Sequence, residues 1–433
     1  MFEFAFHLGI HIECTNGTLV LDILDHYPPL PLFVNYKDHD SYLTYPRLTT
    51  QDELGIHHTL RLRDRVRQIH LCLPSSVLHK ALVFLDGHFP ILEHLFLSFT
   101  DATKNKKIPL PLPETLLAPN LRQLIPPDIS PQTLFRFLTT TVSLTTLKLS
   151  RMQTYHIPPR LLVAHLLPLP QLEELSVVFS TPTPRPAIEE ELLGEEETPA
   201  LLPNLKTLCF EGANTYLECL LSQIRTPLLE QLRITFFSQI ALSQPRLSHF
   251  INATEVFKPF EATVSFSVDE VSLHTGYATA RGFRICVRDL RLDWQVNWAA
   301  QICNALVPSL SGVKNLTLSV FILPMGPNWQ PSGAVSTTWH ALLRSFIRVK
   351  KLRIDDELAR ELAWTLLAGG VGSDPEFLPD LQSIVSETNM FTSFIDARQI
   401  VGRPVQFLTS SGPPSWSRPR CLTAMSRATF FLS

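Results

Sequence analysis

The sequence contains no stretch of eighteen apolar residues and no Cys-x-x-Cys pair. The first absence excludes an ordinary transmembrane helix. The second, together with an odd total of seven well-separated cysteines, favours reduced thiols over a disulfide framework or a zinc site. The apolar segment from Met1 to Ile12 lacks a basic start and carries polar residues, so it does not resemble a signal peptide. We therefore expect a soluble cytoplasmic or nuclear protein that makes no membrane contact.

Motifs that carry catalysis or cofactor binding are also missing. We find no Gly-x-Ser-x-Gly elbow, no phosphate-binding loop, no His-Glu-x-x-His zinc motif and no dinucleotide fingerprint. Glycine is scarce, with 16 residues, and the glycines between 369 and 372 follow an apolar helical run, where a helix-ending turn accounts for them. His57 and His58 would point about 100° apart on a helix, which disfavours a shared metal. We expect no enzymatic activity, no cofactor and no metal.

The charged residues produce no overall field. The chain holds 37 basic and 40 acidic residues and a net charge of -3, so a nucleic-acid partner is disfavoured. Residues 179–201 contain two triplets of glutamate after a proline-rich stretch, and we interpret them as a solvated acidic loop. The alternative is an acidic patch for a partner.

A recurring phrase, roughly Pro-x-Leu-x-x-Leu-x-Leu, extends along most of the chain. Its clearest copy runs from Pro170 to Val177, with Leu172, Leu175 and Val177 at the apolar positions. The copies, weaker ones included, begin at Val66, Leu92, Leu121, Leu144, Leu172, Leu205, Leu229, Val264, Val287, Val313, Val349 and Leu381. Their intervals of 23 to 36 residues overlap the range of leucine-rich repeats and exceed it in the longer units.

Each copy ends in the apolar–polar alternation of a short strand, and most intervals hold a helical stretch. Ser130-Pro131 supplies an N-cap and a first-turn proline for one helix, and Thr50 to Glu53 forms a capping box for another. Because same-direction strands joined by helices wind right-handed, we predict an α/β fold: a right-handed leucine-rich-repeat solenoid, or horseshoe, with a parallel concave sheet and outer helices. Residues 1–407 would form this array, and residues 408–433 a disordered C-terminal tail.

The N-terminal residues predict the first strand of that array. Apolar residues alternate strictly with others from Phe2 to Ile12, which indicates a strand with one apolar face. A first strand leaves an unpaired edge and an uncovered core, which repeat proteins usually close with a capping unit. We expect either a segment before Met1 or a partner at this edge.

The concave face is the candidate binding surface. If the leucines of each copy point into the core, the residues between them point to the open face. The residues predicted there are His94, Phe96, Lys148, Glu174, Ser176, Cys209, Glu211, Gln231, Arg233, Asp289, Arg291, Asp293, Lys351 and Arg353. Their interspersed charges, hydroxyls and aromatic ring suit a protein target better than a phosphate backbone, and the alternative is a merely solvated sheet face.

Several copies carry a resemblance to a known family. The segments 64–69, 89–95, 169–175 and 202–208 resemble the irregular leucine-rich repeats of fungal F-box proteins. The resemblance implies that the repeats select a target, while an N-terminal F-box docks a Skp-type adaptor of a cullin-based ubiquitin ligase. The Leu-Pro-x-Glu-Ile/Leu opening of an F-box does not occur in this sequence.

Three functions follow from these observations. The first is a non-enzymatic protein–protein interaction scaffold of the F-box type, the target-recognition part of a ubiquitin-ligase substrate receptor. The second is a stand-alone leucine-rich-repeat scaffold unrelated to a ligase. The third, a hydrolase or transferase, would need a nucleophile and base that the sequence does not reveal.

Overall fold

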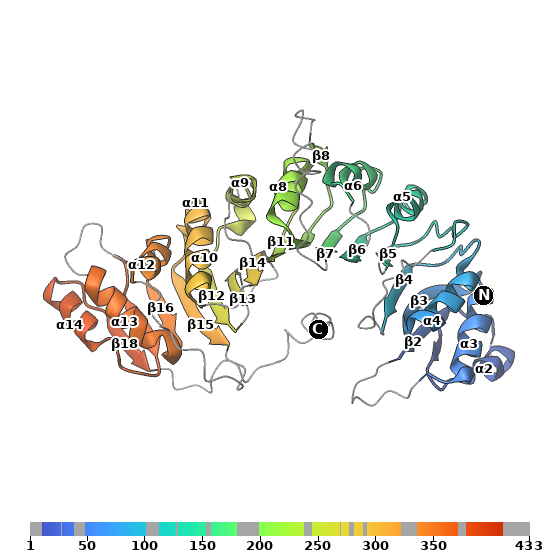
Figure 1. The fold of residues 1–433 in the computed structure, drawn as a ribbon, viewed down its shortest axis with the longest axis horizontal. Coiled ribbons are helices and arrows are strands. Elements are labelled where there is room, and N and C mark those ends of the chain that lie inside the picture. Colours follow the sequence, from blue (N-terminus) through green and yellow to red (C-terminus); the bar gives the residue numbers. More distant parts are fainter. Residues whose placement is uncertain are drawn as a thin grey trace.

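The chain folds as a mixed α/β structure built around one large sheet. The computed structural model describes residues 11–26, 28–38, 48–100, 112–126, 129–152, 157–179, 199–237, 245–268, 270–276, 281–288, 292–321, 336–370 and 378–409. Within these residues, a mostly parallel sheet of sixteen strands has the order β1-β2-β3-β4-β5-β6-β7-β9-β11-β14-β13-β12-β15-β16-β17-β18. The sheet curves along the inner side of an arc, and the helices lie along the outer side (Figure 1).

The strands are short and regularly spaced. Those of the large sheet are β1 (Ile12–Thr15), β2 (Leu32–Lys37), β3 (Val66–Leu73), β4 (His94–Phe99), β5 (Gln123–Ile125), β6 (Thr146–Met152), β7 (Glu174–Phe179), β9 (Thr207–Gly212), β11 (Gln231–Phe236), β12 (Glu261–Ser267), β13 (Glu270–Thr275), β14 (Gly282–Arg288), β15 (Asn315–Phe321), β16 (Lys351–Ile354), β17 (Ser383–Ser386) and β18 (Gln406–Thr409). A separate pair consists of β8 (Ala200–Leu201) and β10 (Ile224–Arg225).

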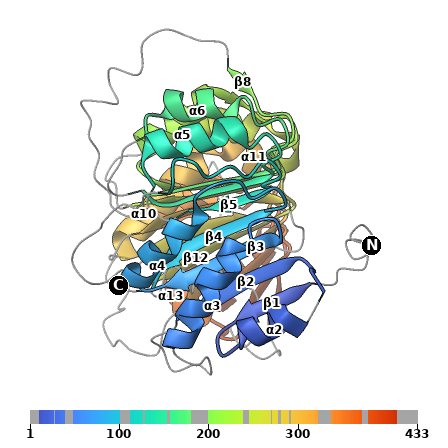
Figure 2. The ribbon, with the colours of Figure 1, turned by 90° about the vertical axis from the view of Figure 1, so that its right-hand side faces the viewer.

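Helices occupy most of the intervals between these strands. They are α2 (Val20–His26), α3 (Thr50–Arg61), α4 (Ser75–Leu82), α5 (Pro131–Thr140), α6 (Pro159–Leu166), α8 (Asn214–Ser222), α9 (Pro245–Ala253), α10 (Leu292–Ala305), α11 (Val307–Leu310), α12 (Ser336–Arg344), α13 (Asp356–Gly370) and α14 (Thr392–Ile400), with 3-10 turns η1 (Val83–Leu85) and η3 (Glu255–Phe257). Seen from the N-terminal end, β1 lies at the edge of the sheet and α3 packs beside it (Figure 2).

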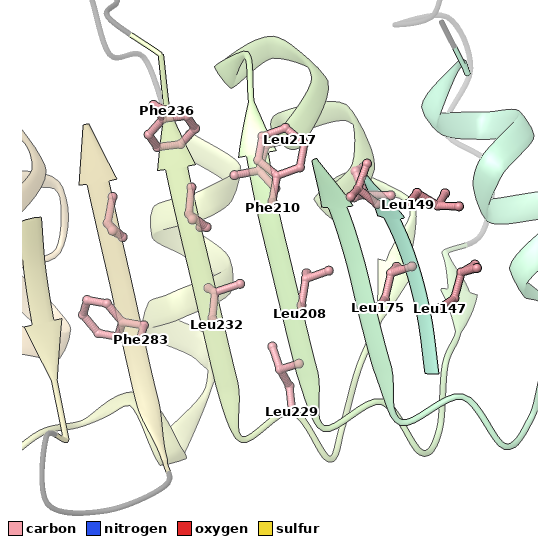
Figure 3. Packing of buried hydrophobic residues seen from close by; sticks show 14 of the residues in the cluster. Leu147, Leu149, Leu175, Leu208, Phe210, Leu217, Leu229, Leu232, Phe236 and Phe283 are labelled. Carbon is pink, nitrogen blue, oxygen red and sulfur yellow. The ribbon is translucent and has the colours of Figure 1, made fainter. Parts of the chain in front are cut away.

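The leucines of the repeated phrase line up across the sheet. Leu147, Leu175, Leu208 and Leu232 are successive register partners on β6, β7, β9 and β11, and each is fully buried. Figure 3 shows their side chains on one side of the strands, with further apolar residues around them. Burying one such side chain contributes about 1.5–3 kcal/mol. A single apolar core, shared by neighbouring units, therefore extends through the described residues.

A chain of backbone hydrogen bonds joins the positions just before the strands. The Glu173 N–H donates to the Thr145 carbonyl, and the Lys206 N–H donates to the Glu173 carbonyl, both at 2.8 Å. The same bond recurs beyond the middle of the sheet, where the Lys350 N–H donates to the Lys314 carbonyl at 2.8 Å. This repeated bond satisfies backbone groups at the turn into each strand and fixes the stagger between units.

Asparagine side chains also link neighbouring copies of the repeated phrase. The side-chain amide of Asn120 donates to the Pro90 carbonyl at 2.7 Å, and that of Asn204 donates to the Pro170 carbonyl at 2.8 Å. In both cases the asparagine precedes the first leucine of one unit, and the proline begins the phrase of the preceding unit. The bond therefore ties each unit to its predecessor outside the sheet.

The sequence indicated a parallel sheet, but one strand of the sheet runs antiparallel to its neighbours. Strand β13 pairs antiparallel with both β12 and β14, and it lies between them. β12 and β14 consequently keep the common direction, so that β14 pairs parallel with β11 and β12 pairs parallel with β15. Short connections allow this arrangement, because antiparallel neighbours need no helical crossover.

The predicted copy at Val287 is wrong in its register. The strand there is β14, whose fully buried apolar residues include Phe283, Ile285 and Val287, and Leu292 begins α10. The alternating residues that form the strand thus come before the leucine spacing at 287–292, which spans the end of β14 and the start of α10. Asp293, predicted on the concave sheet, lies by its backbone in α10, and Asp289 and Arg291 fall outside the described residues.

Two predicted helix starts differ in accuracy. At α5, the Ser130 hydroxyl accepts a hydrogen bond from the Thr133 N–H and Pro131 occupies the first turn, as predicted. At α3, the capping box is formed by Thr49 and Asp52, one residue earlier than predicted. Asp52, and not Glu53, therefore occupies the third helical position. Its carboxylate also accepts a hydrogen bond from the Gly17 N–H at 2.7 Å, which holds the carboxylate in place.

Three predicted segments lie partly or wholly outside the described residues. These are Phe2 to Ile10 of the first strand, residues 180–198 of the acidic loop and residues 410–433 of the tail. The described part of the C-terminus nevertheless shows an element that the sequence did not predict. Strand β18 pairs parallel with β17 and extends to Thr409, past the boundary at 407.

Candidate functional site

The face of the sheet opposite the helices carries two rows of polar residues. Strand alternation places the residues between the buried leucines on this inner face. In one row, Lys148, Ser176, Cys209, Arg233 and Arg284 are successive register partners on β6, β7, β9, β11 and β14. The row continues through His274, Thr263, Thr317 and Arg353 on β13, β12, β15 and β16, and it ends at the apolar, buried Val385 on β17.

The second row lies two residues earlier along each strand, closer to the turn that leads into it. It contains Gln68, His94, Gln123, Thr146, Glu174, Thr207 and Gln231 as register partners. Most of these side chains are half-buried, since each is flanked by its neighbours on the adjacent strands. The described residues predicted for the inner face therefore occupy the strand positions that the leucine spacing assigned to them, except for Asp293.

Ion pairs and a hydrogen bond hold several of these predicted residues in place. The Lys148 ammonium lies 2.8 Å from a Glu174 carboxylate oxygen on the next strand, and the Arg288 guanidinium lies 2.7 Å from Glu211. Arg233 donates to the side-chain oxygen of Gln231 at 2.9 Å. These contacts preset the orientation of long side chains on the open face, which lowers the entropy lost on binding a partner.

Burial changes the acidity of two groups on this face. Burial raises the pKa of the Cys209 thiol, and the nearby Arg233 opposes this only in part. Burial likewise raises the pKa of Glu211, against the opposing charge and hydrogen bond of Arg288. A thiol with a raised pKa is a poor nucleophile at neutral pH, so Cys209 is unsuited to nucleophilic catalysis.

The antiparallel strand β13 contributes a serine–histidine contact that the sequence analysis missed. The Ser272 hydroxyl lies 2.8 Å from Nε2 of His274, two residues later on the same strand. Burial lowers the pKa of His274 to about 3, and the charge of Arg284 acts in the same direction. Such a weakly basic imidazole is a poor general base at neutral pH, and no carboxylate of the described residues hydrogen-bonds to it. The pair is best explained as a buried structural hydrogen bond.

A pocket of about 190 Å³ opens beside this pair on the inner face. Its polar lining comes from the first row, with Thr263, His274, Thr317 and Arg353, and from the register partners two residues earlier on β12, β15 and β16, which are Glu261, Asn315 and Lys351. Ala262, Leu316 and Val385 complete it. Of the residues predicted from the sequence, Lys351 and Arg353 alone belong to this pocket. His274 was missed because its strand, β13, matches no copy of the repeated phrase.

The described residues contain no group of three or more histidine, cysteine, aspartate or glutamate side chains that could hold a metal ion. None of the helices in the described ranges combines the length and apolar character that a membrane crossing requires.

Comparison with known proteins adds no relative. No protein-family model matches the sequence. No curated protein gives a significant match either.

Proposed function

We propose that the chain is a non-enzymatic leucine-rich-repeat solenoid that binds a protein target on its concave face. The observation that carries this proposal is the row of polar side chains from Lys148 to Arg353, which follows the inner face across nine adjacent strands. An extended surface of alternating charge and hydroxyl groups offers a partner many separate contacts. The recurring backbone bond before the strands supports the repeat interpretation.

The more specific form of the proposal is the target-recognition part of an F-box-type ubiquitin-ligase receptor. It rests on the resemblance of segments such as 169–175 to the repeats of fungal F-box proteins. In this form, the concave face holds the target and a Skp-type adaptor docks elsewhere on the receptor. The alternative is a stand-alone scaffold unrelated to a ligase, since the sequence shows no F-box opening.

Charge reversal on the two faces of the arc tests the concave binding surface. We would capture partners with the wild-type chain, with Lys148→Glu/Arg233→Glu on the inner face, and with Arg136→Glu on the outer helix α5. The expected result is a partner that the wild type and the Arg136 variant retain and the inner-face variant loses. Equal capture by all three proteins, with equal thermal stability, contradicts the proposal.

A direct binding measurement separates the two forms. Purified Skp-type adaptor is titrated into the wild-type chain by calorimetry, beside the partner identified above. Saturable binding of the adaptor supports the F-box form. Partner binding without adaptor binding supports the stand-alone scaffold.

A further inference from the structure

The pocket between β12, β13, β15 and β16 has a size that limits its occupant. At about 190 Å³, it is smaller than the roughly 300–1,000 Å³ typical of sites for nucleotides and other small-molecule ligands. It opens on the face where the proposed function places a protein partner. A single side chain of that partner therefore fits the space better than a cofactor does.

The charges around the pocket select the kind of side chain. Lys351 and Arg353 lie two positions apart on one face of β16, so their Cα atoms are separated by about 7 Å. Among the described residues, no carboxylate lies within 4 Å of the Lys351 ammonium, although Glu261 lines the same pocket. A lysine ammonium and an arginine guanidinium at this spacing can both donate charge-assisted hydrogen bonds to one carboxylate.

The remaining polar groups favour an anion of low charge. The Asn315 amide donates to a Glu261 oxygen at 2.8 Å, which partly satisfies that carboxylate. The two basic side chains and Glu261 give the lining a formal charge of +1, since His274 is neutral. Asp355 lies near Arg353 and reduces the local positive field further. A phosphate, with a charge of about −1.5 to −2, costs more to desolvate than a monoanion does, and a lining with so little net positive charge offsets less of that cost.

We propose that this pocket binds the carboxylate of a glutamate or aspartate side chain of the target, held between Lys351 and Arg353. Thr263 and Thr317 line the same row and supply hydroxyls beside the seat of the anion. The inference rests on the proposed function, because it assigns a specificity to the concave surface.

The test uses arrays of degenerate peptides with a fixed central residue. The central residues are glutamate, glutamine and phosphoserine, so that glutamate and glutamine differ only in charge. The proteins are the wild-type chain, Lys351→Gln and Arg353→Gln. Lys314→Gln is the matched control, since it removes one charge nearby from a side chain that lies over the Phe260 ring and not in the pocket.

The expected result is a preference of about tenfold for glutamate over glutamine in the wild type, the ratio that one charge-assisted hydrogen bond can supply. Lys351→Gln and Arg353→Gln should lose this preference, and Lys314→Gln should keep it. Lys351 is exposed, so its substitution leaves the core untouched and remains informative even if Arg353→Gln lowers stability.

Each other outcome overturns part of the reasoning. Peptide binding with no preference for glutamate, or a preference that survives both substitutions, refutes the pocket assignment and leaves the concave binding surface standing. A preference for phosphoserine over glutamate would show that the pocket binds a phosphate and not a carboxylate. Absence of binding to every array, combined with no partner lost on inner-face charge reversal, removes the pocket and the proposed function together.

Discussion

Leu175 offers the most direct test of which side of the sheet is the core. Its side chain is 0% exposed on β7, whereas the next residue, Ser176, lies half-buried on the inner face. Leu175→Asp and Ser176→Asp introduce the same carboxylate at adjacent positions. Leu175→Asn provides an uncharged side chain of the same size as aspartate.

The magnitude follows from two costs at position 175. Loss of the apolar side chain costs about 2–5 kcal/mol, as in other buried leucine truncations. Burial raises the pKa of an aspartate by about 3 or more, which costs about 4 kcal/mol at a pH above the shifted value. The total of about 6–9 kcal/mol is comparable with the whole stability of a typical domain, about 5–15 kcal/mol. Ser176→Asp should change stability by less than about 0.5 kcal/mol, as most surface substitutions do.

The cost of burying the charge also depends on pH, and the direction of this dependence can be predicted. An aspartate whose folded pKa is raised binds its proton more tightly in the folded state, so stability falls as pH rises from about 4 toward the folded pKa, by about 1.4 kcal/mol per pH unit. Leu175→Asp should therefore be more stable at pH 5 than at pH 8 relative to Leu175→Asn. Urea unfolding followed by circular dichroism measures both differences. Equal unfolding midpoints for Leu175→Asp and Ser176→Asp would refute the assigned faces.

Two further predictions concern β13 and its neighbour. Because the pKa of His274 is lowered to about 3, the unfolded state binds a proton below about pH 6.5 that the folded state does not. Acidification toward pH 4 should therefore lower the thermal unfolding temperature, and His274→Gln should make that decrease smaller. A decrease of the same size in the His274→Gln variant contradicts the assignment. Gly282 has a φ of 143°, and a Cβ there would lie 2.4 Å from the Thr275 carbonyl oxygen. Gly282→Ala should therefore lower the unfolding midpoint more than Gly17→Ala, which shares the strain of a positive φ, 77°, but whose Cβ would meet nothing within 4 Å. Equal midpoints would show that the close approach to Thr275 contributes nothing.

The sequence predicted the elements whose spacing repeats and missed those that interrupt the repetition. Leu147, Leu175 and Leu208 follow one rule, and the structure buries all three in register. Strand β13 follows no such rule, because its residues belong to a local meander between two units. The leucine spacing at 287–292 was misleading, since it spans the end of a strand and the start of a helix.

The face of the sheet that carries the candidate site was predictable from the sequence, but the pocket in that face was not. Alternation along β16 sufficed to place Lys351 and Arg353 on the side away from the helices. The pocket needs His274 and Thr263 beside them, and this depends on the order of β12 and β13 in the sheet. Sequence periodicity contains no information on that order, because it describes one strand at a time.

The meander has a mechanical consequence for the whole arc. Where chain order and spatial order agree, a force on either terminus can remove one unit after another, each from a free edge. At β12, β13 and β14 the two orders are reversed, and the strand that follows along the chain is held on both sides by others. We therefore expect those three strands to detach together as one block.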